Sequence, residues 1–338
     1  MNRVALLLLA CVTGSLLHAQ DAAPFFAGRT PLLLDPSRTG FESGGRISFL
    51  HQDQWLQVPG AWRNEQLAGE WCLRNDKKEV NSWFGMGLRV GSEQLGANGG
   101  RLSNVGVLTA VHLRAGPKSY LSSGLELRWA NGRLRDGSGA WGSQYDGMRY
   151  DAAMASGETW STSNQTWAEA RAGISFTVKA EEESPRRRER DLLVVGVSAD
   201  HLGHLVLKES GTSTAVAPMR FTVYGLGELP LGRWENGFVA ADLIGHVQGP
   251  FQTGRLNLYV GRHLYNRVRS PGGPMLLGFK AGVGYQWQGA ILANAAVDLG
   301  SLTIGMAYGW SLFNGDKMAS GRQTFELMMQ LRMAKRMQ

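Results

Sequence analysis

Few side chains of this chain combine the residue type and the spacing that chemistry requires. His201 and His204 could supply two ligands to one metal ion, but no carboxylate-rich partner lies near them in the sequence. Gly225 and Gly227 form a pair without the third glycine and the following helix of a nucleotide-binding loop. No G-x-S-x-G motif of a serine hydrolase is present. We therefore expect no catalytic residue, no cofactor and no metal ion, and the function has to be sought in the architecture.

The architecture is indicated by an alternating pattern that is clearest in residues 302–312, which read L-T-I-G-M-A-Y-G-W-S-L. The even positions are large and apolar, whereas the odd positions between them are small. A period of two places these two sets on opposite faces of a β-strand. An apolar face that includes Tyr308 and Trp310, opposite a nearly bare face, is typical of a strand with lipid on one side and a crowded barrel lumen on the other.

The same alternation recurs in fourteen segments, most of them about ten residues long, which suits strands that cross a bilayer at a tilt. Bacterial single-chain barrels have an even number of strands. A soluble propeller or sandwich is the alternative, but no blade motif repeats along the chain. We predict an all-β fold, a transmembrane antiparallel β-barrel of about 14 strands with both termini periplasmic. The expected strands are residues 45–52, 63–73, 82–91, 103–114, 120–130, 168–179, 191–199, 219–228, 237–246, 255–264, 275–287, 290–299, 302–313 and 323–333.

Charged residues fall repeatedly on the face that carries the small side chains. A charge facing lipid costs about 2–4 kcal/mol near the bilayer midplane, so this face must be the lumen. Aromatic residues gather toward strand ends on the apolar face, where amphipathic rings favour the headgroup region. The chain is therefore expected to be integral to the outer membrane and to contact its lipid. The inward charges are Arg89, Arg171, Asp242, Lys280, Asp298 and Glu326, and the outward aromatics are Trp71, Trp129, Tyr285, Trp287, Tyr308 and Trp310.

The first residues predict export. A positively charged start, an apolar stretch and a small residue at Ala19 are typical of a signal peptide, here over residues 1–19. The barrel domain is then residues 20–338, in which residues 20–44 form an N-terminal segment that is periplasmic or lumenal. Cys11 leaves with the signal peptide, so Cys72 cannot form an intrachain disulfide. A net charge of +7 without a basic stripe predicts no nucleic-acid partner.

Two motifs near the start of the predicted domain are more specific than the alternation. Residues 31–40 read P-L-L-L-D-P-S-R-T-G, and residues 51–55 read H-Q-D-Q-W. Together with the final strand they resemble the PorP/SprF family of the type IX secretion system in Bacteroidetes, which typically opens with N-P-x-x-x-G and then a strand ending in R-x-Q-W. The chain departs from that pattern where Asp35 replaces the asparagine and where Met333 stands in place of a terminal aromatic residue. The residues that match the family motif, with no role assigned, are Asp35, Pro36, Gly40, Gln54, Trp55 and Pro59.

The resemblance implies a non-enzymatic outer-membrane barrel that assists secretion or surface anchoring of a specific cargo protein, such as a gliding adhesin. The implied partners are a secreted cargo protein with a C-terminal sorting domain and the periplasmic and lipoprotein components of the secretion apparatus. Recognition would use the long connections expected at residues 131–167, 201–218 and 314–322, or a charged turn at residues 181–190. Two other functions stay open: a porin-like diffusion channel for small solutes, and a barrel hydrolase with a serine and a histidine on adjacent strand faces.

Overall fold

The structure is a computed structural model. It describes residues 23–56, 60–74, 80–96, 100–134, 142–145, 148–149, 151, 153–155, 163–179, 191–210, 217–231, 236–270, 273–287, 289–312 and 323–333. Across these ranges, no helix has the length and apolar character that a membrane crossing requires. The predicted signal peptide, Pro59, the charged turn at residues 181–190 and the connection at residues 314–322 all lie outside the described residues.

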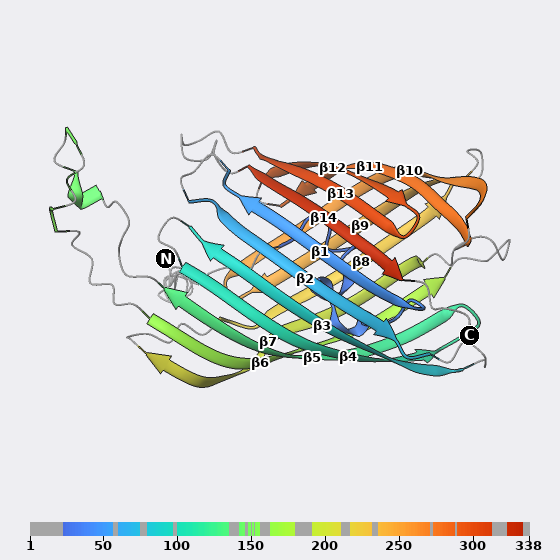
Figure 1. The fold of residues 1–338 in the computed structure, drawn as a ribbon, viewed down its shortest axis with the longest axis horizontal. Coiled ribbons are helices and arrows are strands. Elements are labelled where there is room, and N and C mark those ends of the chain that lie inside the picture. The colour runs from blue at the N-terminus through green and yellow to red at the C-terminus, as the bar shows by residue number, and fades with distance from the viewer. Residues whose placement is uncertain are drawn as a thin grey trace, which may run out of the picture.

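Fourteen antiparallel strands form a closed barrel (Figure 1). Each strand pairs with its neighbours in the chain, and β1 closes the barrel by pairing with β14, where Gly45 lies opposite Met333. The predicted fold class and strand number are therefore confirmed. The strands are β1 (Gly45–Gln54), β2 (Trp62–Cys72), β3 (Ser82–Leu95), β4 (Gly100–Arg114), β5 (Ser119–Leu134), β6 (Ser163–Lys179), β7 (Asp191–Ser210), β8 (Arg220–Pro230), β9 (Gly237–Gln248), β10 (Phe251–Ser270), β11 (Gly273–Gln286), β12 (Ala290–Leu299), β13 (Leu302–Ser311) and β14 (Thr324–Met333).

Strand β7 departs most clearly from the predicted boundaries. We expected a connection over residues 201–218, but β7 continues to Ser210. His201 (φ 58°) and Gly203 (φ 67°) have a left-handed backbone, and the pairing with β6 shifts register beside them. The strand therefore contains a bulge, whose residues look like a turn in the sequence. The expected connection at residues 131–167 is likewise shorter, because β5 reaches Leu134 and β6 begins at Ser163.

Outward-facing side chains are apolar and inward-facing ones are polar, as expected of a barrel wall with lipid outside. On β5, Leu125, Leu127 and Trp129 are 55%, 71% and 60% exposed, whereas Glu126 between them is fully buried. The charges predicted to face inward follow this rule, and so do most of the aromatics predicted to face outward. The buried charges are Arg89, Arg171, Asp242, Lys280 and Glu326, Asp298 is half-buried, and the exposed aromatics are Trp71, Trp129, Tyr285, Trp287 and Trp310.

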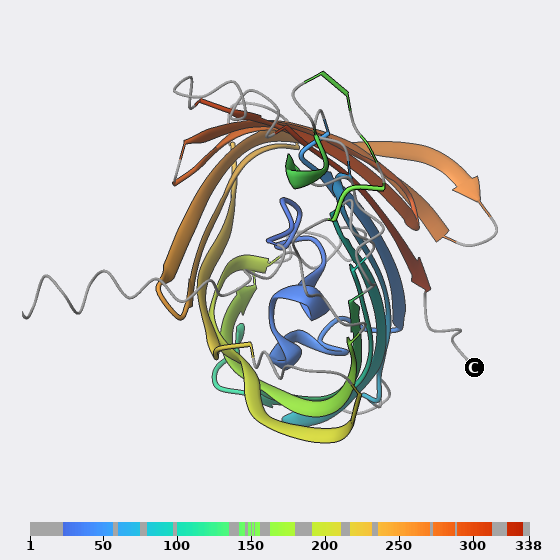
Figure 2. The same cartoon turned by 90° about the vertical axis from the view of Figure 1, so that its left-hand side faces the viewer.

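The N-terminal segment lies inside the barrel, where Figure 2 shows it in blue within the ring of strands. We call residues 23–44 the plug; it contains the short helix α2 (Pro31–Leu34) and the 3-10 helix η1 (Pro36–Arg38). Its apolar side chains pack on three parts of the inner wall. Phe25 and Phe26 pack with Leu292, Ala296, Ala307 and Met328, Ala27 and Leu34 with Val194, Tyr224 and Ile244, and Leu32 with Ala68 and Leu108.

The plug runs along the lumen between the two ends of the barrel. We call the end where β1 begins and β14 ends the terminal end, and the opposite end the far end. Ala23 lies near the far end, beside the last residues of β1, whereas Gly45 begins β1 at the terminal end. The prediction that both termini are periplasmic stays a prediction. The ends of the barrel wall, Gly45 and Met333, lie together, and Ala23 lies toward the other end.

Candidate functional site

Glycines line the inner wall where plug atoms approach most closely, which are backbone atoms at Gly85 and Gly124 and the Asp35 carboxylate at Gly173. Three of them lie on β3, β5 and β6, and a Cβ atom added at any of the three would overlap an atom of the plug. Side chains larger than hydrogen are therefore incompatible with the observed position of the plug. The overlaps are Gly85 with Thr39 O at 1.9 Å, Gly124 with Pro36 O at 2.4 Å and Gly173 with Asp35 Oδ1 at 1.9 Å.

The small residues on the inward face of β13 also leave room for the plug. Gly305 lies against the ring of Phe26, and Gly309 against the ring of Phe25, with added Cβ atoms 3.0 Å and 2.9 Å from the nearest ring carbons. The crowded lumen that the small residues of β13 predicted is therefore present. The crowding comes from two phenylalanine rings of the plug.

Polar side chains of the wall bind the plug mainly through its backbone. Arg171 donates one hydrogen bond to Leu32 O and one to Leu33 O, both at 2.9 Å. Ser198 Oγ donates to Leu34 O at 3.1 Å. These bonds satisfy carbonyl groups that lie in the barrel interior, away from bulk water. Further bonds of this kind run from Gln330 Nε2 to Arg29 O at 2.9 Å and from Arg255 Nη1 to Ala23 O at 3.3 Å.

Glu326 on β14 holds the beginning of the plug. Its carboxylate accepts hydrogen bonds from the backbone N–H groups of Phe25 at 2.6 Å and Phe26 at 2.7 Å. It also accepts a bond from Nε2 of Gln52 at 2.9 Å. A buried carboxylate is costly unless its oxygens are hydrogen-bonded, and here three donors meet that need. The wall carboxylate and the plug N–H groups therefore satisfy each other's hydrogen-bonding requirements.

Arg171 is oriented by a buried network of charges on the wall. Its Nε lies 2.6 Å from Asp200 Oδ1, and its Nη1 lies 3.5 Å from Glu126 Oε2. Arg89 Nη2 lies 2.8 Å from Glu126, and Arg128 contacts both Glu126 and Asp200. Planar guanidinium groups suit such shared, buried ion pairs. The network leaves the two terminal nitrogens of Arg171 pointing at the plug backbone.

The first half of the family motif lies in the plug. Asp35 is fully buried, and its carboxylate accepts hydrogen bonds from Ser37 N at 2.7 Å and Tyr224 Oη at 2.8 Å. Burial raises the pKa of the Asp35 carboxyl, while the bond from the Ser37 backbone opposes that change. The two bonds use different carboxylate oxygens, so an asparagine could accept only one of them with its single oxygen, and its amide N–H would donate to Tyr224 Oη instead. Pro36 begins η1 directly afterwards and is also buried.

Gly40 ends this half of the motif with a backbone that glycine adopts without strain. Its φ is 63°, and an added Cβ would lie 2.4 Å from Trp71 O. Its N–H donates to Glu70 Oε2 at 2.7 Å, and its carbonyl accepts from Trp83 Nε1 at 3.3 Å. Glycine at this position therefore lets the plug turn along the wall toward β1.

The second half of the motif lies apart from the first, at the far end. Gln54 is the last residue of β1, and its Nε2 donates to Gln52 Oε1 at 2.8 Å. Trp55 has φ 62°, is 40% exposed, and lies edge-on to Trp62 with the ring centroids 6.3 Å apart. The structure therefore brings Asp35, Pro36 and Gly40 together in the plug, and Gln54 and Trp55 together at the rim.

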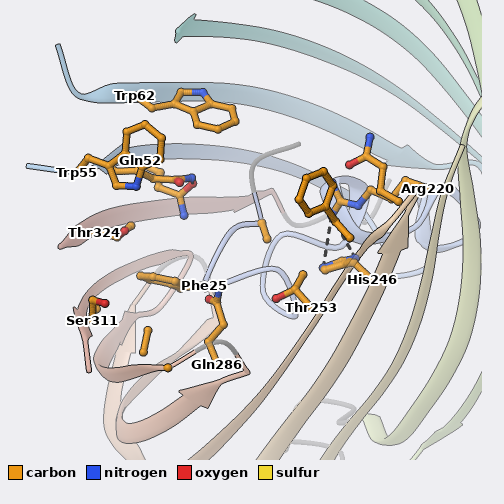
Figure 3. A pocket seen from close by; sticks show the side chains of 17 residues that line it. Phe25, Gln52, Trp55, Trp62, Arg220, His246, Thr253, Gln286, Ser311 and Thr324 are labelled. Carbon is orange, nitrogen blue, oxygen red and sulfur yellow. Dashed lines mark hydrogen bonds between the residues drawn. The ribbon is translucent and has the colours of Figure 1, made fainter. Parts of the chain in front are cut away.

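A cavity of about 260 Å³ lies between the plug and the far-end rim, and Figure 3 shows its side chains. Its walls come from the far ends of β1, β2 and β8 to β14, and the plug adds Ala23 and Phe25. Sequence reasoning pointed to Gln54 and Trp55 here, but not to their neighbours on distant strands. The other residues of the lining are Gln52, Trp62, Arg220, His246, Gln248, Phe251, Thr253, Gln286, Gly289, Ala290, Gly309, Ser311 and Thr324.

The serine and histidine that a barrel hydrolase would need do meet, on β4 and β5. His112 Nδ1 lies 2.8 Å from Ser122 Oγ, and His112 Nε2 lies 2.8 Å from Thr39 O. Both side chains are buried, and the rings of Phe41 and Trp83 pack on the imidazole. The pair faces the plug rather than lipid or an open cavity. Its geometry therefore fits a role in holding the plug.

The two histidines that could have bound a metal are also engaged. His201 Nδ1 lies 2.8 Å from Glu169 Oε2, and the His204 ring lies 5.3 Å from that of Trp167. Among the described residues, no three histidine, cysteine, aspartate or glutamate side chains are grouped so as to hold a metal ion.

Comparison with known families gives a match over residues 21–331 to the type IX secretion system membrane protein PorP/SprF. The chain belongs to the PorP/SprF family. Its 14-strand barrel, with an apolar exterior, makes this family member an integral outer-membrane protein. The family's secretion role is consistent with a protein that is not an enzyme.

Solved structures that resemble the chain include a channel, a transporter and a FadL homologue. They are the CymD monoaromatic hydrocarbon channel (12% identity, TM-score 0.47, 94% of this chain and 96% of that chain), the P. putida toluene transporter TodX (12%, 0.42, 89% and 93%) and a Pseudomonas aeruginosa FadL homologue (10%, 0.43, 88% and 92%). No curated protein matches the chain.

Proposed function

We propose that this PorP/SprF protein assists the secretion or surface anchoring of one class of exported cargo protein, such as a gliding adhesin. The family match over residues 21–331 carries this proposal, because it extends across the plug and the whole barrel. The proposed partners are a cargo protein with a C-terminal sorting domain and the periplasmic and lipoprotein components of the secretion apparatus. The barrel performs no chemistry on the cargo.

The plug supports a role through surfaces rather than through a pore. Plug residues contact wall residues on β2, β4, β7 to β10 and β12 to β14, so the segment spans the lumen. A folded or extended cargo chain has no path through such an interior. The cargo therefore crosses the membrane elsewhere, and this barrel supplies a place to dock.

The far end offers a docking ledge formed by β6 and β7. Among the described residues, β7 pairs with β8 as far as Asp200 opposite Arg220, and from there to Ser210 it pairs with β6. Leu205, Val206 and Leu207 follow one another on this extension and are 63%, 38% and 46% exposed. Consecutive exposed apolar residues on a strand edge are typical of a site that another chain covers.

The test is a deletion of the gene followed by proteomic comparison of the cell surface, culture medium and periplasm. We expect one sorting-domain protein to leave the surface or medium and to accumulate in the periplasm, and the wild-type gene to restore it. A complementing gene with Leu205→Ser and Leu207→Ser should restore less, whereas Lys208→Ser on the same ledge is the matched control. Unchanged distribution of every sorting-domain protein in the deletion strain would overturn the proposal.

The two alternative functions receive no support from the interior. A diffusion channel needs an open lumen, and the plug occupies it. A hydrolase needs substrate access to Ser122, and that side chain is buried beneath the plug with His112.

A further inference from the structure

The far-end cavity is lined on one side by the plug. Phe25 lies in its lining, and Glu326 accepts hydrogen bonds from Phe25 N at 2.6 Å and from Gln52 Nε2 at 2.9 Å. The cavity volume of about 260 Å³ is just below the range of about 300–1,000 Å³ that is typical of ligand pockets. It can take one small group or the end of a longer molecule.

One side of the cavity carries an ordered chain of amides. Gln52 donates to Glu326 and accepts at its Oε1 from Gln54 Nε2 at 2.8 Å. The buried carboxylate therefore sets the direction of both amides, and Gln54 Oε1 is left as an acceptor at the cavity. Preset polar groups of this kind bind a ligand without the cost of ordering them.

The neighbouring strand places an aromatic side chain across from that acceptor. Gln54 and Trp62 are cross-strand partners in the pairing of β1 with β2. Trp62 Nε1 is buried and makes no hydrogen bond to any described residue. Because that nitrogen is buried, a ligand hydroxyl in the cavity can donate to Gln54 Oε1 but cannot reach Trp62 Nε1.

Trp55 adds an apolar face above this pair. Its φ of 62° is an uncommon and costly conformation for a large side chain, and such strain gathers at ligand sites. The strained backbone holds the ring edge-on to Trp62, with 40% of the Trp55 residue exposed. Flat aromatic surfaces of this kind bury the C–H face of a ring while its hydroxyl groups bond elsewhere.

The rest of the lining narrows the ligand class. Among the described residues it supplies further amides and hydroxyls, the imidazole of His246, no carboxylate, and one formally charged side chain, Arg220. A metal cation would need carboxylate oxygens, and an acyl chain would leave the amides unsatisfied. The amides and hydroxyls are Gln248, Gln286, Thr253, Ser311 and Thr324.

We propose that the far-end cavity binds a saccharide unit, with a hydroxyl that donates to Gln54 Oε1 and the sugar ring against Trp55. The amides and the exposed aromatic face of the lining suit a polyhydroxylated ring. Gln54 and Trp55, the second half of the family motif, thereby gain a role that is separate from cargo delivery.

The test uses the full mature protein in lipid nanodiscs on an array of bacterial surface glycans, followed by calorimetric titration with the glycan that binds best. We expect saturable binding, and we expect Trp55→Ala and Gln54→Met each to weaken it by about tenfold or more, or about 1.4 kcal/mol. Trp129→Ala, which removes an aromatic ring from the outer wall, is the matched control and should bind like the wild type. Each variant must first show the compact gel band of a folded barrel.

Three results would overturn the proposal. The first is a wild-type protein that binds no glycan on the array. The second is glycan binding that Trp55→Ala and Gln54→Met leave unchanged. The third is saturable binding of short peptides without glycan binding, lost in the same two variants, which would assign the cavity to a peptide.

Discussion

Replacing Gly85 with alanine tests the fit between the barrel wall and the plug. The added methyl group would lie 1.9 Å from Thr39 O and 2.8 Å from Gly40 Cα, which are backbone atoms that no side-chain rotation can move away. Overpacking of this kind costs about 1–3 kcal/mol. A displaced plug would also lose the bonds from His112 to Thr39 O and from Gly40 N to Glu70, each worth about 1 kcal/mol. We therefore expect Gly85→Ala to lower the free energy of unfolding by about 3–5 kcal/mol.

Two assays on the purified protein in detergent read out this change. Chemical unfolding gives the stability, and limited trypsin digestion reports on the plug, because Arg38 is only 6% exposed when the plug is seated. We expect a lower unfolding midpoint and faster cleavage after Arg38 in Gly85→Ala. The control is Gly225→Ala, since a Cβ at Gly225 meets no atom within 4 Å. The reasoning is refuted if the two variants unfold and digest alike.

Three further predictions concern buried polar groups. Arg171→Met should destabilise the barrel by about 3–5 kcal/mol, because Asp200 and Glu126 each lose one buried ion-pair partner; a loss below about 1 kcal/mol would argue against the network. Tyr224→Phe should cost about 1–3 kcal/mol in chemical unfolding, because Asp35 loses one of its donors; wild-type stability would contradict that role. A serine-reactive fluorophosphonate should not label the folded protein, and labelling that Ser122→Ala abolishes would revive the hydrolase alternative.

The barrel wall was predictable because its chemistry alternates with every residue. Large apolar residues face lipid and small or charged residues face inward. The residue types of Leu125, Glu126 and Leu127 therefore predict which face of β5 each occupies. The extension of β7 was not predictable, because Leu205, Val206 and Leu207 are consecutive and His201 and Gly203 resemble a turn.

The plug and the cavity were predictable only in part. Glycines on the inward faces of strands indicated that other atoms occupy the lumen close to the wall. A glycine in the sequence does not show which residues approach it. The contact of Gly173 with Asp35, for example, joins residues whose separation in the chain carries no local signal. The family motif pointed to Asp35 and Trp55, yet their surroundings come from strands across the whole barrel.

The most direct test of a surface role without a pore is the electrical current through the purified protein in a planar bilayer. We predict no steady current from the wild-type protein, because residues 23–44 lie inside the barrel and contact most of the strands of its inner wall. A variant that lacks residues 23–44 should conduct. This variant is the positive control, because its current shows that the assay detects barrels inserted in the bilayer. A steady ohmic current from the wild-type protein, equal to that of the shortened variant, would contradict the plugged lumen and restore the diffusion channel.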